Sequence, residues 1–255
     1  MKKKTTIVFS INVHENVKFL QKQIEDIEAN VLLDFVVLIN ANEFMYNEII
    51  NNKPLMARTA KASKVTKAAR AFIELYPEPI NKIHNHGTLT KGIYLNMEYA
   101  VRNYDFEYFI VLSSRNLFYN TLHKDNYHAM PRISYGATIE QLNYQEWHWR
   151  IFLQTKLGHY IIANNWRFCQ AYMHHEGLGF DYASSTQIVD FLEKNKDIKE
   201  DLFNFNWGVE EFALHSIALN LTGYYYNIGN WTNDDDFVNI HKLPSDRFVY
   251  KTFRR

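Results

Sequence analysis

Short apolar runs alternate with amphipathic segments along the first half of the chain. Residues 5–13 are mostly apolar and rich in β-branched side chains, as is typical of a strand buried on both faces. Apolar residues then recur at helical spacing between Val17 and Ile27. A second apolar run, 34–40, ends in polar residues. This alternation predicts right-handed crossovers and an α/β fold with a mainly parallel central sheet.

The later segments continue the pattern less regularly. A Lys- and Ala-rich stretch, 56–73, predicts a helix that ends before Pro77, and Thr88 is expected to cap the next one. Strands are expected at 80–83 and 107–113. Further helices are expected at 145–157, 185–195 and 209–220. No long linker or internal repeat interrupts the chain, so we expect one continuous domain over residues 1–255.

Composition narrows the class of protein. The chain has 255 residues, of which 47% are hydrophobic, enough to build a full core. Lys plus Arg equals Asp plus Glu at 28 each, which gives no electrostatic case for binding nucleic acid or an anionic membrane. No apolar run reaches the ~18 residues of a membrane span. The basic start leads into a strand and not into a signal-peptide cleavage site, so we expect a cytoplasmic protein.

Several common motifs are missing from the sequence. It holds neither a GxGxxG nor a GxxxxGK[ST] loop, which argues against a dinucleotide oxidoreductase and a P-loop enzyme. It also lacks the GxSxG elbow of α/β-hydrolases.

Polar residues gather where the expected parallel strands end. In such sheets the ligand lies beyond the carboxyl ends of the strands, and a polar rim there suits a nucleotide. The candidates for contacts to such a nucleotide are His14, Glu15, Asn40, Asn42, Arg115 and Asn116. Each of the first four could equally cap a helix or a turn.

Six segments, in this order, resemble a known family. They are IVFSINVHENVKFLQKQI, VVLINANE, IHNHGTLTKGIYLNMEYAV, YFIVLSSRN, WGVEEFAL and FVYKTFRR. Together they resemble the core-2/I-branching β-1,6-N-acetylglucosaminyltransferases and peptide O-xylosyltransferases. The resemblance implies a glycosyltransferase-A-like α/β/α sandwich with a Rossmann-like sheet. Residues 1–116 would then form the nucleotide-sugar-binding half and residues 117–255 the acceptor-binding and catalytic half. The family's membrane anchor has no counterpart here, and the Asn-, Lys- and Tyr-rich composition would suit a bacterial or viral relative.

The resemblance also implies catalytic roles. An inverting transferase needs a general base to take the proton from the acceptor hydroxyl. The family's catalytic glutamate corresponds to Glu211, and Glu210 stands beside it. Without the resemblance, both would be ordinary residues of a helix's first turn, where carboxylates are favoured.

The leaving diphosphate needs positive charge. The segment after the central strand reads Ser113-Ser-Arg-Asn116 and has no Asp-x-Asp to bind a metal, so the transferase is expected to work without Mn²⁺ or Mg²⁺. The family uses basic residues near the C-terminus instead, which correspond to Lys251 with Arg247 and Arg254 in support. The acidic loop Asp234–Asp236 is where this expectation of metal independence could fail.

The partners implied are a nucleotide-sugar donor and a carbohydrate acceptor. The donor is expected to be uridine diphosphate (UDP) linked to N-acetylglucosamine or xylose. Aromatic rings stack on sugars, and the candidates for acceptor contacts are Glu146, Trp147, Trp149 and Trp207. Two other functions stay open, namely a metal-dependent transferase of another family with this fold and a catalytically inactive, glycan-binding relative.

Overall fold

The computed structural model describes residues 2–13, 16–61, 71–83, 86–113, 116–142, 147–169, 177–230 and 247–251. The helices of these residues are α1 Val17–Asn30, α2 Glu43–Asn51, α3 Lys53–Lys61, α4 Thr88–Asn103, α5 Trp147–Phe152, α6 Lys156–Ala163, α7 Tyr182–Lys194, α8 Lys196–Asn204 and α9 Ala213–Leu221. The strands are β1 Lys3–Lys4, β2 Ile7–Val13, β3 Phe35–Ala41, β4 Ala71–Leu75, β5 Tyr104–Asp105, β6 Tyr108–Ser113, β7 Asn116–Phe118, β8 Arg132–Ile133, β9 Gly136–Ala137, β10 Phe168–Cys169, β11 Leu178–Asp181, β12 Tyr225–Asn227, β13 Gly229–Asn230 and β14 Val249–Lys251.

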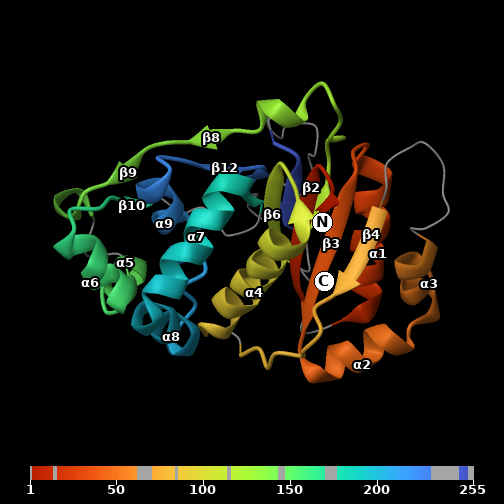
Figure 1. Ribbon diagram of the computed structural model, residues 1–255, viewed down its shortest axis with the longest axis horizontal. Helices are drawn as coiled ribbons and strands as arrows, with labels where there is room; N and C mark the ends of the chain where they lie inside the picture. The colour runs from red at the N-terminus through yellow and green to blue at the C-terminus, as the bar shows by residue number, and fades with distance from the viewer. Residues whose placement is uncertain are drawn as a thin grey trace.

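A seven-stranded sheet runs through the molecule in the order β4-β3-β2-β6-β11-β12-β8 (Figure 1). The first four strands are parallel, as the alternation of strand and helix predicts. The last three are antiparallel to their neighbours. The expectation of a mainly parallel sheet is therefore correct for the first half only, because the second-half strands that extend the sheet reverse direction.

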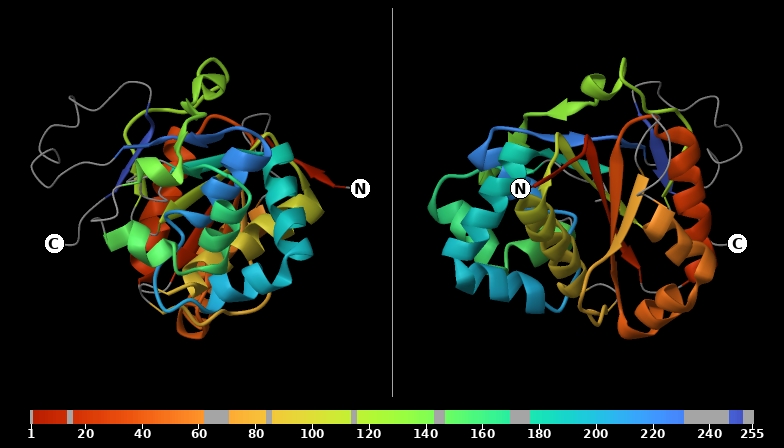
Figure 2. Two further views of the ribbon diagram at one scale, coloured as in Figure 1. Left: turned by 90° about the vertical axis from the view of Figure 1, so that its left-hand side faces the viewer. Right: turned by 45° about the vertical axis from the view of Figure 1, so that its right-hand side comes forward.

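Helices cover both faces of this sheet, with α1 on one side and α4, α7 and α8 on the other (Figures 1 and 2). Successive side chains of a strand point to opposite faces. Accordingly, Val8 packs with Met97 of α4, whereas its neighbour Phe9 packs with Ile24 of α1. The fold is thus an α/β arrangement in which an apolar layer lies on each face of the sheet.

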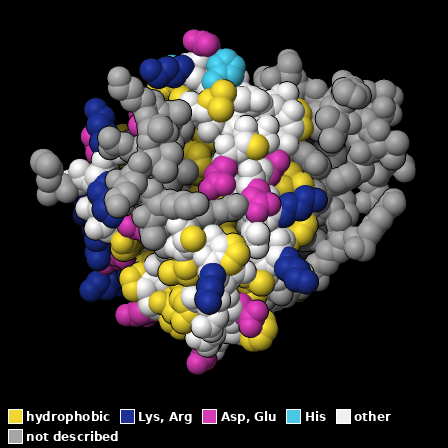
Figure 3. All heavy atoms as spheres, turned by 90° about the vertical axis from the view of Figure 1, so that its right-hand side faces the viewer, with side chains coloured by type: hydrophobic (Ala, Val, Ile, Leu, Met, Phe, Trp, Pro, Cys, Tyr) yellow, Lys and Arg dark blue, Asp and Glu magenta, His cyan; other side chains and the backbone are white. Residues whose placement is uncertain are grey.

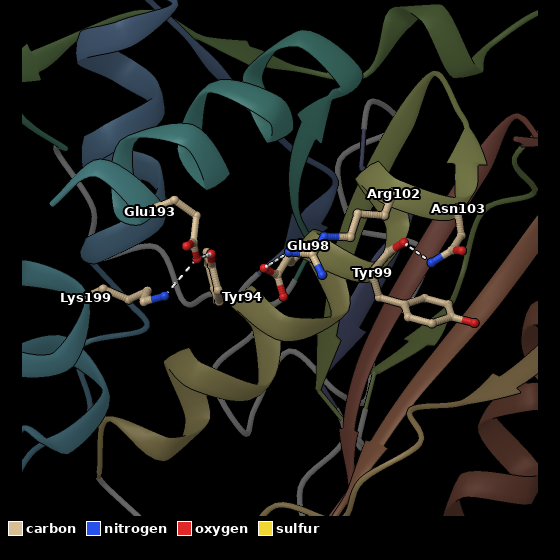
Figure 4. A network of polar contacts seen from close by, with 7 residues as sticks. All are labelled: Tyr94, Glu98, Tyr99, Arg102, Asn103, Glu193 and Lys199. Atoms are coloured by element: carbon tan, nitrogen blue, oxygen red, sulfur yellow. Dashed lines mark hydrogen bonds and ion pairs between the residues drawn. The ribbon is translucent and has the colours of Figure 1, made fainter. Parts of the chain in front are cut away.

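Polar contacts fix α4 to the helices beside it (Figure 4). The Tyr94 hydroxyl donates to Glu193 Oε1 of α7 at 2.5 Å, and Lys199 Nζ of α8 donates to the same oxygen at 2.7 Å. The bond from Lys199 is the main reason that the pKa of Glu193 is lowered. These contacts hold α4 in place over the sheet, and with it the first turn of α4.

The face on the right-hand side of Figure 1 carries charges of both signs. Figure 3 shows acidic, basic and hydrophobic side chains interspersed among the described residues there. This distribution agrees with the equal numbers of acidic and basic residues in the sequence.

Two of the predicted elements are wrong. Of the helix expected over 56–73, the part up to Lys61 belongs to α3 and residues 62–70 lie outside the described residues, but Ala71–Leu75 forms strand β4, and 80–83 are not a strand. Pairing with β3 decides the outcome at β4, where sequence periodicity favoured a helix. Thr88 is the first residue of α4 and not its cap, since its Oγ1 accepts from Ile83 N–H at 3.0 Å.

Candidate functional site

A row of polar residues crosses the carboxyl ends of three parallel strands. Asn40 of β3 is the Cα partner of Asn12 of β2, and Asn12 is the partner of Ser113 of β6. Asn40 is fully buried. The row lies at the edge of the sheet where parallel α/β folds bind ligands, so it is the natural place to look for a site.

Lys82 reaches this row from the segment that follows β4. Its Nζ donates to both the backbone oxygen and the Oδ1 of Asn40, each at 2.5 Å. Burial of the amine lowers the pKa of Lys82 well below its ordinary value. Sequence reasoning missed this lysine because the apolar residues around it, Ile80 and Ile83, predicted a strand. A single cation inside that run was the only signal.

Helix α4 closes over the same row. Asn12 Nδ2 donates to Leu89 O at 2.9 Å. A Cβ at Gly92 would lie 2.4 Å from Asn12 Oδ1 and 3.2 Å from Lys82 Cε, so only glycine allows this approach. Asn12 Oδ1 and Asn40 Nδ2 are buried, and neither has a hydrogen-bond partner within the described part of the chain. Since buried polar atoms are nearly always paired, these two atoms are candidates for contacts to a polar ligand.

Two predicted donor-binding residues hold the local backbone. Asn42 caps α2, and its Oδ1 accepts from Met45 N–H at 2.9 Å. Asn116 Oδ1 accepts from Ser113 N–H at 2.7 Å and so joins the start of β7 to the end of β6. Donor binding by Asn42 and Asn116 stays a prediction beside these structural roles.

A small sheet brings the C-terminal basic segment to the end of the central strand. β14 pairs antiparallel with β7, and Lys251 is the Cα partner of Asn116. Arg247 donates from Nη1 to the backbone oxygen of Asn227, the last residue of β12. The backbone of this segment is thereby docked beside the end of β6. The side chain of Lys251 and the whole of Arg254 lie outside the described residues.

Glu210 and Glu211 lie in a turn before α9, which begins at Ala213. The prediction that they open a helix is wrong. Phe212 takes a non-helical φ of −132° while its ring packs on Trp149. Glu210 is only 6% exposed. Just before this turn, Phe205 O accepts from Gly87 N–H at 2.9 Å, which joins the segment to the start of α4.

The aromatic candidates for acceptor binding separate into different environments. Trp149 is 5% exposed and packs against Phe168 and Phe212 at ring distances of 5.9 and 5.1 Å, so it belongs to the core. The prediction that it contacts an acceptor is wrong, because composition does not say which side of a helix faces inward. Trp207 is half-buried. The remaining predictions fall outside the described residues, namely His14, Glu15, Arg115, Glu146 and the side chain of Trp147.

The described residues contain no group of three His, Cys, Asp or Glu placed to hold a metal ion. Nor is any helix among them long and apolar enough to cross a membrane.

Comparison with known proteins does not identify a functional site. No family model matches the sequence, and no curated protein matches it. The carboxyl edge of the sheet is therefore the candidate site on geometry alone, with its core in Asn12, Asn40 and Lys82.

Proposed function

We propose that the chain is an inverting, metal-independent glycosyltransferase with a glycosyltransferase-A-like fold. It would transfer N-acetylglucosamine or xylose from a UDP-sugar to a hydroxyl of a glycan. The observation that carries the proposal is the pairing of β14 with β7, because it sets the backbone of Lys251 opposite Asn116. That pairing supports a cationic segment at the edge of the sheet where a nucleotide would bind.

The order of the strands also supports the proposal. Four parallel strands run β4-β3-β2-β6, and their carboxyl ends carry the row of Asn40, Asn12 and Ser113. The loop that holds Glu210 and Glu211 starts from a segment bonded to the beginning of α4 at Gly87. The proposed nucleotide contacts and the proposed general base thus lie on segments that both connect to the start of α4.

The proposed chemistry uses this chain's own side chains. Glu211 takes the proton of the acceptor hydroxyl as the oxygen attacks the anomeric carbon of the donor sugar. The bond between that carbon and the diphosphate oxygen breaks on the opposite face, which inverts the configuration. Lys251 and Arg247 stabilise the negative charge that grows on the departing UDP, as cations do in other phosphate-releasing sites.

Turnover of the general-base variant tests the proposal. We expect the wild-type protein to release UDP from UDP-N-acetylglucosamine or UDP-xylose when a glycan acceptor and EDTA are both present. Glu211→Gln keeps the shape but removes the base, so its kcat should fall by roughly 10²–10⁴-fold with an unchanged melting temperature. Glu200→Gln on the exposed side of α8 is the matched control and should keep full activity.

Three results would contradict parts of this proposal. Full turnover by Glu211→Gln would remove the assigned base. Activity that requires Mn²⁺ would favour a metal-dependent transferase. Binding of glycans with no turnover of any UDP-sugar would favour an inactive, glycan-binding protein.

A further inference from the structure

Lys82 has a half-buried side chain whose amine is largely desolvated. No carboxylate among the described residues pairs with this amine, which donates to the two oxygens of Asn40. A buried ammonium normally pairs with a carboxylate, because taking an isolated charge out of water is costly. Desolvation therefore disfavours the charged form of Lys82 at the carboxyl edge of the sheet, unless an anion lies beside the amine.

The surroundings of Lys82 make that positive charge still less favourable. The segment that carries it is bonded to the first turn of α4 through Ile83 and Thr88, and its Cε lies close to Gly92 of the second turn. The amino end of a helix carries a partial positive charge, which repels a cation and attracts an anion. An anion placed here would be favoured by both the helix and the lysine.

Donor groups remain available for such an anion. A lysine ammonium has three N–H donors, and Asn40 accepts two of those of Lys82. Asn40 Nδ2 adds donors that are buried and have no partner within the described residues. Asn12 Oδ1 is an unpartnered acceptor beside them, suited to a hydroxyl next to the anionic group. This combination is more specific than a helix end alone.

We propose that Lys82 and Asn40 form a subsite for a phosphoryl group, with Asn12 accepting from a hydroxyl near it. The phosphoryl chemistry follows from the cluster itself. Its assignment to the diphosphate of a nucleotide sugar rests on the proposed function. Lys82 would then act from β4's side of the row, whereas Lys251 acts from the β7 side.

Binding of an anion at this subsite should be coupled to proton uptake by the amine of Lys82. The pKa of Lys82 is lowered by burial, and no charged group contributes to that shift. Among the described residues, the uncharged Asn40 of β3 and Gly92 of α4 face the amine, and His86 and Lys91 are the titratable side chains between residues 86 and 92. An anion beside the amine raises its pKa again, so binding should take up a proton and tighten as the pH falls.

Calorimetric titration of three proteins tests the subsite. The ligands are UDP, pyrophosphate and uridine, with EDTA present, at pH 7, 8 and 9 and in two buffers of different ionisation enthalpy. Lys82→Met removes the charge at similar length, and Lys91→Met removes a charge from α4 outside the cluster. We expect the wild type and Lys91→Met to bind UDP with uptake of up to about one proton. Lys82→Met should bind UDP about 10- to 100-fold more weakly and without that uptake.

Each outcome decides one of the two proposals. UDP binding by Lys82→Met with wild-type affinity overturns the subsite, even if sugar transfer proceeds normally. Lys82-dependent binding of pyrophosphate by a protein that turns over no UDP-sugar keeps the subsite and rejects the transferase. If the wild type binds none of the phosphate ligands, both proposals fail. Should Lys82→Met not fold, the absence of proton uptake by the wild type overturns the subsite.

Discussion

The amine of Lys82 has a desolvation penalty that its hydrogen-bond partners offset only in part. Its amine is held by two oxygens of Asn40 at 2.5 Å, and these contacts supply dipoles without a countercharge. Dipoles reduce the desolvation penalty but do not cancel it, so the pKa of Lys82 stays well below its ordinary value. The charged form of Lys82 is therefore destabilising in the folded protein and not in the unfolded chain.

This difference predicts how stability depends on pH. Between the lowered pKa of Lys82 and the ordinary value of 10.5, the unfolded chain binds more protons at this residue than the folded protein does. The contribution of Lys82 to the free energy of unfolding therefore rises with pH in that window and stops rising near pH 10.5. Urea unfolding at pH 7, 8 and 9 should show the wild type gaining stability relative to Lys82→Met. The difference between wild type and Lys91→Met should stay flat, and an equal slope for both variants would contradict the prediction.

The sequence predicted where along a strand a residue lies, but it did not predict which distant residues surround its side chain. Asn40 was identified because it ends an apolar strand, and the structure does set it in a row at the carboxyl edge. Trp149 was misassigned because its burial depends on Phe168 and Phe212, which come from distant parts of the sequence. Lys82 was missed for the same reason, since its partner Asn40 lies 42 residues away.

At the scale of elements, Asp181 joins three parts of the fold. It ends β11 and caps α7, where its Oδ1 accepts from Ser184 N–H at 2.7 Å. Its Oδ2 accepts from the Tyr224 hydroxyl at 2.5 Å, next to β12. That bond, followed by burial, raises the pKa of Tyr224 to about 12. One carboxylate thus sets the start of a helix and the position of the neighbouring strand.

Replacing this carboxylate should destabilise the protein measurably. Asp181→Ala removes both the cap and the acceptor for Tyr224, so the free energy of unfolding should fall by about 1–3 kcal/mol. Asp190→Ala, on the exposed side of α7, is the control and should change it by less than about 0.5 kcal/mol. Chemical denaturation followed by circular dichroism measures both. Equal stabilities for the two variants would show that the cap contributes little.

Helices and strands were predictable where the spacing of apolar residues was regular and a capping residue stood at the end of the element. α1 matches the expected amphipathic segment and is capped by Asn16, whose Oδ1 accepts from Lys18 N–H at 2.9 Å. The expected helix over 56–73 failed because Ala71–Leu75 gains a partner in β3. The start of α9 was misplaced because the ring of Phe212 packs inward before the helix begins. Tertiary contacts decided both failures.

At the scale of the whole molecule, β11 connects the two halves of the chain. It pairs antiparallel with β6, and Phe180 is the Cα partner of Phe109. Phe180 is fully buried in the core that also contains Met97 of α4 and Leu214 of α9. The sheet therefore passes without interruption from residues of the first half to residues of the second.

This continuity predicts that both halves lose stability together. Phe180→Ala should lower the free energy of unfolding by about 3–5 kcal/mol, because it leaves a cavity between β6 and the helices. Hydrogen exchange should show the loss equally in β2 and in α9. Ile162→Ala is the control, since Ile162 is 42% exposed, and should change stability little. A loss confined to α9 would indicate two independently stable halves.

The α/β class was predictable because strands and helices alternate locally. The antiparallel strands β11, β12 and β8 were not, because they are short and their partners lie far away in sequence. Forming such a pairing costs the entropy of closing a long loop. Whether the contacts offset that cost depends on residues far apart in the sequence, so no local pattern predicts the pairing.

The pairing of Lys251 with Asn116 also sets an order of assembly during synthesis. Asn12, Asn40, Lys82 and Gly92 all leave the ribosome before Asn116, whereas Lys251 follows Asn116 by 135 residues (251 minus 116). At ~5–20 residues per second, that interval lasts about 7–27 s. For about the first half of it, until β11 at Leu178–Asp181 has been synthesised, β6 exposes an unpaired edge. The nascent chain thus holds one cationic side of the site well before the other, and chaperones that cover sheet edges would act within that interval.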